Sequence, residues 1–266
     1  MKMNIDINDF ENVSDKGRGY FNFHRGRYEY CIPKIIKRSN GKNVIDVGSK
    51  YLLQSSYLAR EGFDVCAYDT KKVIENKVVR ERAENEGVDL RKLGDLSEGE
   101  VALNEERDKF DILIMSEVIE HLAFNPVKMW RSLFRVLRPG GKIFISTPNS
   151  VSLEKRVVES ARILTGVGRG VAVDGIIETP TYGHHWKEYS ISELYRYFDR
   201  LGVEEKFIDV NTYNYRPYSD QEDFQSIAKN ILRSIGNIFY NLSDEIFLEI
   251  NMPDTKTKLE DVESYV

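Results

Sequence analysis

The feature that most constrains the fold is a regular alternation of short apolar segments with longer amphipathic ones, from Asn43 to Ser146. The apolar segments have the length and β-branched content of buried strands, and the segments between them have the length of helices. Such an alternation is typical of a mostly parallel sheet covered by helices on both faces. The predicted strands are Asn43–Val47, Asp64–Tyr68, Val88–Leu93, Phe110–Met115 and Lys142–Ser146, and the predicted helices are Leu52–Arg60, Lys71–Asn85 and Val127–Val136.

The flanking sequence is less regular. His24–Arg38 is predicted to be a helix that Pro33 kinks or breaks, and Pro139-Gly140-Gly141 a turn that stops a helix. The later predicted elements are the helices Ser152–Gly166, Ile191–Leu201 and Phe224–Ile235 and the strands Lys206–Tyr213 and Glu245–Asn251. We expect one α/β domain over residues 1–253, with 1–42 as an N-terminal cover, 150–190 as a lid or substrate insertion, and 254–266 as a flexible tail.

Composition narrows the classes of function. The 266 residues carry a net charge of −5 with the two signs nearly balanced, which disfavours nucleic acid as a partner. The two cysteines, Cys31 and Cys66, are too few for a disulfide framework and indicate a reducing cytoplasm. No segment has the ~18 apolar residues of a membrane span, although the basic flank of Ser152–Gly166 leaves a peripheral lipid contact open. The oligomeric state stays open.

Charged residues follow the apolar run Phe110–Met115 directly. If a helix begins near Ser116, then Glu117, Glu120 and His121 lie on one face of its first turn. In open α/β sheets, ligands bind at the carboxyl ends of the strands, where charged side chains such as these lie next to the start of a helix.

This cluster has three interpretations. The acids stabilise the start of a helix while His121 packs, or they bind a divalent cation such as Mg²⁺ or Mn²⁺, with Glu117, Glu120 and His121 as ligands and His185 as a further one. A third role does not need a metal. His121 or His184 acts as the general base on a hydroxyl, because imidazole titrates near neutral pH.

A second set of residues lies at the ends of the first three predicted strands. Asp46 lies near the end of the first strand and Gly48 just after it, Asp69 ends the second, and Gly94-Asp95 follows the third. With Phe110–His121, this order resembles the class I S-adenosylmethionine (SAM) dependent methyltransferases over about Asn43 to Asn251. The resemblance implies a doubly wound, Rossmann-like seven-stranded sheet with an antiparallel edge strand, and SAM as the methyl donor.

The resemblance also assigns residues to the cofactor. It implies that Asp46, Gly48 and Ser49 hold the methionine end of SAM, and that Asp69 holds the ribose. The residues implied at the adenine are Asp95 and the Leu96 backbone, and those near the sulfonium are Ser116 and Glu117. Independently of the resemblance, Arg25-Gly26-Arg27-Tyr28 either reaches a carboxylate of cofactor or substrate or simply covers the edge of the sheet.

The glycine loop departs from the family pattern. Lys50 and Leu52 stand where the family usually has two further glycines. The spacing to the next strand is unchanged, so these are substitutions and not a deletion. A lysine there either meets the cofactor's carboxylate or crowds the site.

The Glu-x-x-Glu-His group with a later histidine pair resembles two metal-assisted groups of methyltransferases. These are the ubiquinone-biosynthesis O-methyltransferases and the small-RNA 3′-terminal 2′-O-methyltransferases. The favoured function is therefore O-methylation of a small-molecule or sugar-containing acceptor, with His121, Glu117 and His184 as catalytic residues. The alternatives are a metal-dependent RNA ribose 2′-O-methyltransferase and, because of Lys50 and Leu52, a methyltransferase-like binding protein without turnover.

Overall fold

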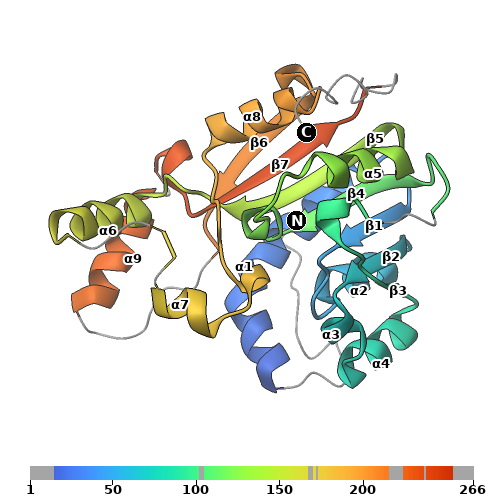
Figure 1. Cartoon of the computed structure of the whole chain (residues 1–266), viewed down its shortest axis with the longest axis horizontal. Coiled ribbons are helices and arrows are strands. Elements are labelled where there is room, and N and C mark those ends of the chain that lie inside the picture. The colour runs from blue at the N-terminus through green and yellow to red at the C-terminus, as the bar shows by residue number, and fades with distance from the viewer. Residues whose placement is uncertain are drawn as a thin grey trace.

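The computed structural model describes residues 15–101, 105–166, 170–171, 173–215, 224–236 and 238–253. One seven-stranded sheet runs through the molecule in the order β3-β2-β1-β4-β5-β7-β6 (Figure 1). Its strands are β1 (Asn43–Val47), β2 (Asp64–Asp69), β3 (Asp89–Lys92), β4 (Phe110–Ser116), β5 (Leu137–Pro148), β6 (Ile208–Tyr213) and β7 (Glu245–Asn251). The doubly wound sheet with an antiparallel β7 confirms the predicted fold class.

The α-helices lie between these strands and around the sheet. They are α1 (Asp15–Arg38), α2 (Leu53–Arg60), α3 (Lys71–Ile74), α4 (Lys77–Glu86), α5 (Val127–Val136), α6 (Leu153–Leu164), α7 (Val173–Glu178), α8 (Ile191–Arg200) and α9 (Phe224–Gly236). Short 3-10 helices include η2 (Leu96–Glu98), η3 (Ile119–His121) and η4 (Thr181–Gly183).

The pairing of the strands defines the functional edge. β1 pairs in parallel with β2 on one side and with β4 on the other, so the strand order reverses there. β7 is antiparallel to both β5 and β6. The carboxyl ends of β1, β2, β4, β5 and β6 therefore meet at one edge of the sheet, and ligands of open α/β sheets bind at such a reversal.

Alternate residues of β4 supply the two hydrophobic cores. Leu113 and Met115 join the core beneath α5 and α8, whereas Ile112 and Ile114 join the core beneath α1, α2 and α4. Each strand residue turns to the face opposite its neighbour's, so one apolar run fills both layers.

Three expectations about elements differ from the structure. α1 runs from Asp15 to Arg38 without a break at Pro33, and Ile32 and Ile35 on either side of Pro33 are buried in the core. The predicted helix Lys71–Asn85 is divided into α3 and α4, and the Asn76 side chain caps α4 by accepting from the Val78 N–H at 3.0 Å.

The third difference concerns Pro139-Gly140-Gly141, which was predicted to be a turn that stops a helix. It lies inside β5, where Gly140 has φ 69° and the pairing with β4 shifts register. Gly140 has the left-handed backbone of a turn, but β5 continues through it with an irregularity in its pairing to β4.

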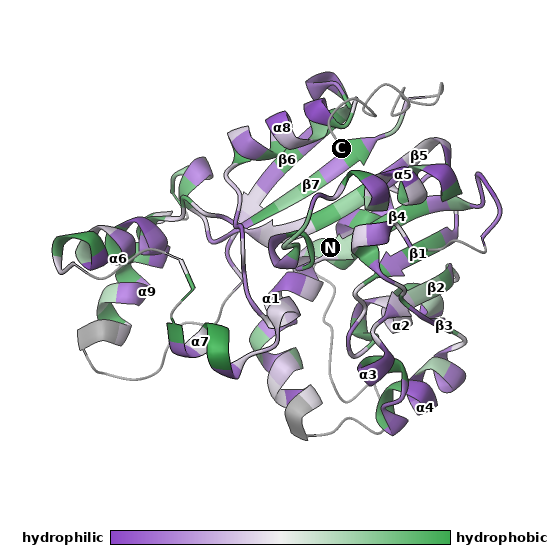
Figure 2. Cartoon of the chain, in the orientation of Figure 1, coloured by the Kyte–Doolittle hydropathy of each residue, from purple (hydrophilic) through white to green (hydrophobic). Residues whose placement is uncertain are grey.

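Helices α6 and α7 extend away from the sheet (Figure 1). α6 packs against α9, and α7 lies nearby (Figure 1). Apolar colour gathers on these helices (Figure 2). Their exposed apolar side chains are Val157, Val158, Ile163 and Leu164 on α6, Val173, Ile176 and Ile177 on α7, and Ile227, Ile231 and Ile235 on α9. Among the described residues, no helix is both long and apolar enough to cross a bilayer.

Candidate active site

The loop after β1 keeps a glycine-loop backbone although two of its glycines are replaced. Gly48 has φ 83°, and Lys50 and Leu52 have φ of 49° and 58°. Left-handed backbone is strained for residues with a Cβ. Leu52 is fully buried in the core, so its packing offsets that strain. The loop thus has a left-handed backbone at Gly48, Lys50 and Leu52, a conformation that glycine adopts without strain.

Asp69, at the end of β2, holds this loop. Its carboxylate accepts from the Lys50 N–H at 2.6 Å and from the Thr70 N–H at 2.6 Å. Burial raises the pKa of Asp69, and the two backbone donors oppose that rise. Each oxygen retains a lone pair, so the carboxylate can still accept from ribose hydroxyls.

Asp46, at the end of β1, is 2% exposed and accepts from the Ser55 hydroxyl at 2.5 Å. Burial raises its pKa to about 6, against the lowering effect of Ser55. A buried carboxylate with this environment is stabilised by a cation, and the ammonium of SAM is such a group.

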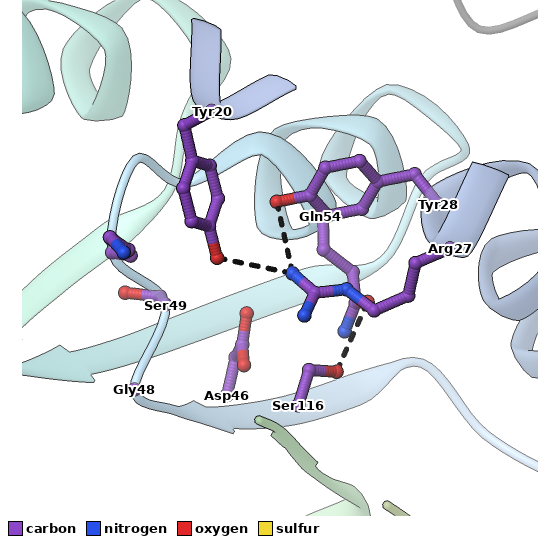
Figure 3. A pocket seen from close by; sticks show the side chains of 9 residues that line it. Tyr20, Arg27, Tyr28, Asp46, Gly48, Ser49, Gln54 and Ser116 are labelled. Atoms are coloured by element: carbon purple, nitrogen blue, oxygen red, sulfur yellow. Dashed lines mark hydrogen bonds between the residues drawn. The ribbon is translucent and has the colours of Figure 1, made fainter. Parts of the chain in front are cut away.

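A pocket joins this loop to α1 (Figure 3). The residues that line it are Tyr20, Arg27 and Tyr28 from α1, Asp46, Gly48, Ser49 and Lys50 from β1 and its loop, Gln54 from α2, and Ser116 from β4. The structure therefore brings Asp46, Gly48, Ser49 and Ser116 together as predicted. Gln54 was not predicted to lie in the site, and its Oε1 accepts from the Ser116 hydroxyl at 3.3 Å.

Arg27 points into this pocket and is 2% exposed. Its Nη2 donates to the hydroxyls of Tyr20 at 3.2 Å and Tyr28 at 3.5 Å. Its Nε and Nη1 are buried and have no hydrogen-bond partner among the described residues, and the Glu117 carboxylate lies 3.5 Å from Nη1. Glu117 thus offsets part of the charge of the guanidinium, and the unused Nε and Nη1 donors can bind a further anion.

The predicted adenine residues lie beyond β3. Asp95 is exposed and caps η2 by accepting from the Ser97 N–H at 2.8 Å and hydroxyl at 2.6 Å, bonds that lower its pKa. Leu96 beside it is half-buried. Neither residue lines the pocket in Figure 3.

No helix begins at Ser116, contrary to the expectation for the carboxylate–histidine cluster. β4 continues through Ser116, Glu117 has φ 56°, and only the 3-10 helix η3 follows before α5. The left-handed turn at Glu117 separates its side chain from that of Glu120. Glu117 accepts from the Ser146 hydroxyl at 3.2 Å, and Glu120 accepts from the Thr147 hydroxyl at 3.0 Å.

Glu120, His121 and His185 form a compact group, with one potential ligand atom from each lying within 4.8 Å of the others. Glu120 is fully buried and its Oε1 has no hydrogen-bond partner among the described residues. Burial raises the pKa of Glu120 well above its usual value, and the charge of Glu117 adds to the rise. Glu117 is not part of this group.

The two imidazoles of this group share a pattern. His121 Nδ1 lies 2.9 Å from the His184 carbonyl oxygen, and His185 Nδ1 lies 2.9 Å from Glu188 Oε1. If each Nδ1 carries the proton, each Nε2 keeps a free lone pair. Burial lowers the pKa of His121, although the bond to His184 raises it. Glu188 was not predicted, and its only sequence signal is its spacing of i, i+3 from His185.

His184 contributes differently from its prediction. Its ring is buried, Nε2 lies 3.0 Å from the Thr179 carbonyl oxygen, and its own carbonyl accepts from His121. The next residues are tied to η3, because the N–H of Trp186 donates to the Glu120 carbonyl at 2.8 Å. His184 thus positions His121 in this structure, while His185 supplies the second imidazole.

Known proteins resemble this chain in sequence. A family described as a methyltransferase domain matches residues 23–204. The ubiquinone biosynthesis O-methyltransferase of Aliivibrio fischeri is 28% identical over 202 residues, which cover 74% of this chain and 78% of that protein. The corresponding protein of Coxiella burnetii is 24% identical over 244 residues, covering 87% of this chain and 96% of its own length.

Solved structures share the fold. A SAM-dependent methyltransferase of Thermotoga maritima, described as a possible histamine N-methyltransferase, has a TM-score of 0.57 at 15% identity over 91% of this chain and 97% of that one. The phosphoethanolamine N-methyltransferase 2 of Haemonchus contortus, solved with SAM, has a TM-score of 0.52 at 16% identity over 94% of this chain and 60% of that one.

Proposed function

We propose that this chain, which belongs to the class I SAM-dependent methyltransferases, methylates a hydroxyl oxygen of a small-molecule or sugar-containing acceptor. SAM is the methyl donor of the family. The relatives named as ubiquinone biosynthesis O-methyltransferases act on oxygen by their name, which supports an oxygen acceptor in this distant relative.

The observation that carries the proposal is the pair of imidazoles beside Glu120. With each Nδ1 donating to an oxygen, Nε2 of His121 or His185 is the atom that accepts a proton. The lowered pKa of His121 keeps its ring neutral near pH 7. A hydroxyl needs such a base, because it is a weak nucleophile while protonated.

Each residue then has a defined task. We place the cofactor's carboxylate at Arg27, its ammonium at Asp46 and its ribose at Asp69, which orients the methyl group toward the acceptor. His121 Nε2 takes the acceptor's proton as the new O–CH₃ bond forms. SAM supplies a sulfonium methyl that needs no further activation, and its S–CH₃ electron pair stays on sulfur to give S-adenosylhomocysteine.

As an alternative to a general base, the same residues fit a divalent cation, because His121 Nε2 cannot take a proton while it binds a metal. Buried Glu120 Oε1 has no partner among the described residues, and each imidazole has the oxygen contact at Nδ1 that metal-bound histidines usually show. Glu120, His121 and His185 would hold the ion, which would lower the pKa of a bound hydroxyl. Titration with Mn²⁺, followed by electron paramagnetic resonance, tests this site directly. Binding that Glu120→Gln removes supports it, and absence of binding to the wild-type protein refutes it.

The acceptor side is proposed to lie in residues 150–190. This insertion reaches η3 through Trp186, and Lys155 of α6 is paired with Glu188, the partner of His185. The exposed apolar side chains of α6 and α7 suit a lid that closes over an acceptor with apolar surface.

The test is a transfer reaction with SAM carrying a ¹³C-methyl group and a panel of phenols, catechols and hydroxylated sugars. The expected product has an O–CH₃ resonance. His121→Asn should reduce turnover by about 10²–10⁴-fold and leave S-adenosylhomocysteine affinity unchanged. Products with N–CH₃ or C–CH₃ groups, or full turnover by His121→Asn, would contradict the proposal.

A further inference from the structure

Lys50 retains a conformation that disfavours it. Its φ is 49°, in the region where a glycine is unstrained. Leu52 is strained in the same way but is fully buried, whereas Lys50 is exposed. Core packing therefore explains Leu52 and leaves Lys50 unexplained. Strained residues of this kind are over-represented at functional sites.

The Lys50 side chain reaches across the pocket to α1. Its Nζ lies 4.0 Å from the centre of the Tyr20 ring, within the range of a cation–π interaction. Tyr20 and Lys50 both line the pocket but come from different elements, α1 and the loop after β1. This contact therefore joins the two sides of the pocket.

Tyr20 in turn contacts Arg27. Its hydroxyl accepts from Arg27 Nη2 at 3.2 Å, seven residues further along α1 and on the same helix face. The ring is also packed against Tyr51 and His24, at centroid distances of 5.4 and 4.2 Å. The Tyr20 hydroxyl is thus one of the groups that hold the Arg27 guanidinium, together with the Tyr28 hydroxyl and the Glu117 carboxylate.

From this chain of contacts, we infer that Lys50 is a positioning residue for the cofactor's amino-acid end. Through Tyr20, it holds Arg27 so that Nε and Nη1, which form no hydrogen bond within the described residues, can donate to the carboxylate of SAM, although Glu117 lies 3.5 Å from Nη1. The inference rests on the placement of that carboxylate at Arg27 under the proposed function. The lysine side chain, which a glycine at this position would not supply, would thereby contribute to the preference for a ligand that carries a carboxylate.

The experiment compares SAM with decarboxylated SAM, which lacks only the carboxylate, by calorimetric titration. Lys50→Gly removes the ammonium group but keeps the backbone N–H that donates to Asp69. It should weaken SAM binding by about two- to fivefold and leave decarboxylated SAM unaffected. Its unfolding temperature should not fall, because glycine tolerates the left-handed backbone.

Three further variants separate positioning from structure. Lys50→Arg should restore SAM affinity, because a guanidinium also lies favourably over an aromatic ring. Tyr20→Phe should reproduce the selective loss, because it keeps the ring and removes the hydroxyl that contacts Arg27. Combined with Lys50→Gly, it should weaken SAM binding no further than either change alone.

The opposite results are equally clear. Equal weakening of both ligands by Lys50→Gly would mean that Lys50 only covers the cleft, and unchanged binding of both would mean that it has no role. Either result overturns the inference. Arg27→Met tests the premise separately: it should weaken SAM binding much more than that of decarboxylated SAM, and if it does not, the placement of the carboxylate fails together with the role of Lys50.

Discussion

Asp46 illustrates how burial at the residue level prepares a ligand site. Its carboxylate is buried without a basic side chain as its hydrogen-bond partner, and its pKa is raised to about 6. A folded-state pKa above the unfolded value means that Asp46 favours the fold most at low pH and loses that contribution as pH rises through about 6. A bound ammonium reverses the preference, because it stabilises the anion.

Cofactor affinity is therefore expected to depend on pH. Binding of S-adenosylhomocysteine should tighten from pH 5 to pH 7 as Asp46 ionises, and Asp46→Asn should flatten this dependence as well as weaken binding. Titrations at several pH values measure both effects. The same slope in Asp46→Asn would assign the proton to another group, of which Asp69 is the first candidate because its pKa is also raised.

Gly48 is constrained by space as well as by its backbone. A Cβ there would lie 2.5 Å from Cγ2 of Val118, whereas a Cβ at Gly62, with a similar φ of 78°, would meet nothing within 4 Å. Gly48→Ala should therefore lower the free energy of unfolding by about 1–3 kcal/mol more than Gly62→Ala. Urea denaturation of the two variants measures the difference, and equal losses would show that only backbone strain matters.

At the level of elements, the insertion is connected to the catalytic group through Glu188. This carboxylate contacts His185 Nδ1 at 2.9 Å and Lys155 Nζ of α6 at 2.5 Å. Burial raises the pKa of Glu188, but its bond to His185 and the charge of Lys155 outweigh burial and lower it to about 2. The Glu188 carboxylate is therefore ionised at every pH at which the protein would be assayed.

Glu188→Gln should reduce turnover and leave S-adenosylhomocysteine affinity unchanged, because it disturbs His185 without touching the cofactor pocket. A loss of about 10-fold or more is expected for the partner of a catalytic or metal-binding histidine. Glu159→Gln, an exposed position on α6, is the matched control. Comparable turnover of the two variants would remove His185 from the mechanism.

For the molecule as a whole, α1 belongs to the folding unit and is more than the cover expected from residues 1–42. It buries Phe21, Tyr28, Cys31, Ile32 and Ile35 against the sheet and α2. The helix that supplies Arg27 to the pocket is thus anchored in the core, and the pocket and the core share one element.

Ile35→Ala should lower the free energy of unfolding by about 2–5 kcal/mol, as for other fully buried isoleucines. Its half-buried neighbour Ile36 is the control of the same residue type and should lose clearly less. Chemical denaturation with one cooperative transition provides the values. Equal, small losses would show that α1 detaches from the domain.

The sequence by itself determined the sheet, because the periodicity and length of its apolar segments are local properties. Val127–Val136 and Asn43–Val47 have the predicted bounds, and the acids Asp46 and Asp69 lie at strand ends, as expected. Lys50 and Leu52 were recognised as substitutions, but their left-handed backbone was not predicted.

Only the tertiary structure decided which functional groups meet. Glu117 separates from Glu120 because one left-handed residue, and not a helix, follows β4. His185 joins His121 because a segment more than sixty residues later donates hydrogen bonds to η3, and Tyr20 lies over Lys50 because α1 packs beside the loop after β1. These contacts join residues far apart in the chain, so they depend on how the elements pack, which no local pattern records.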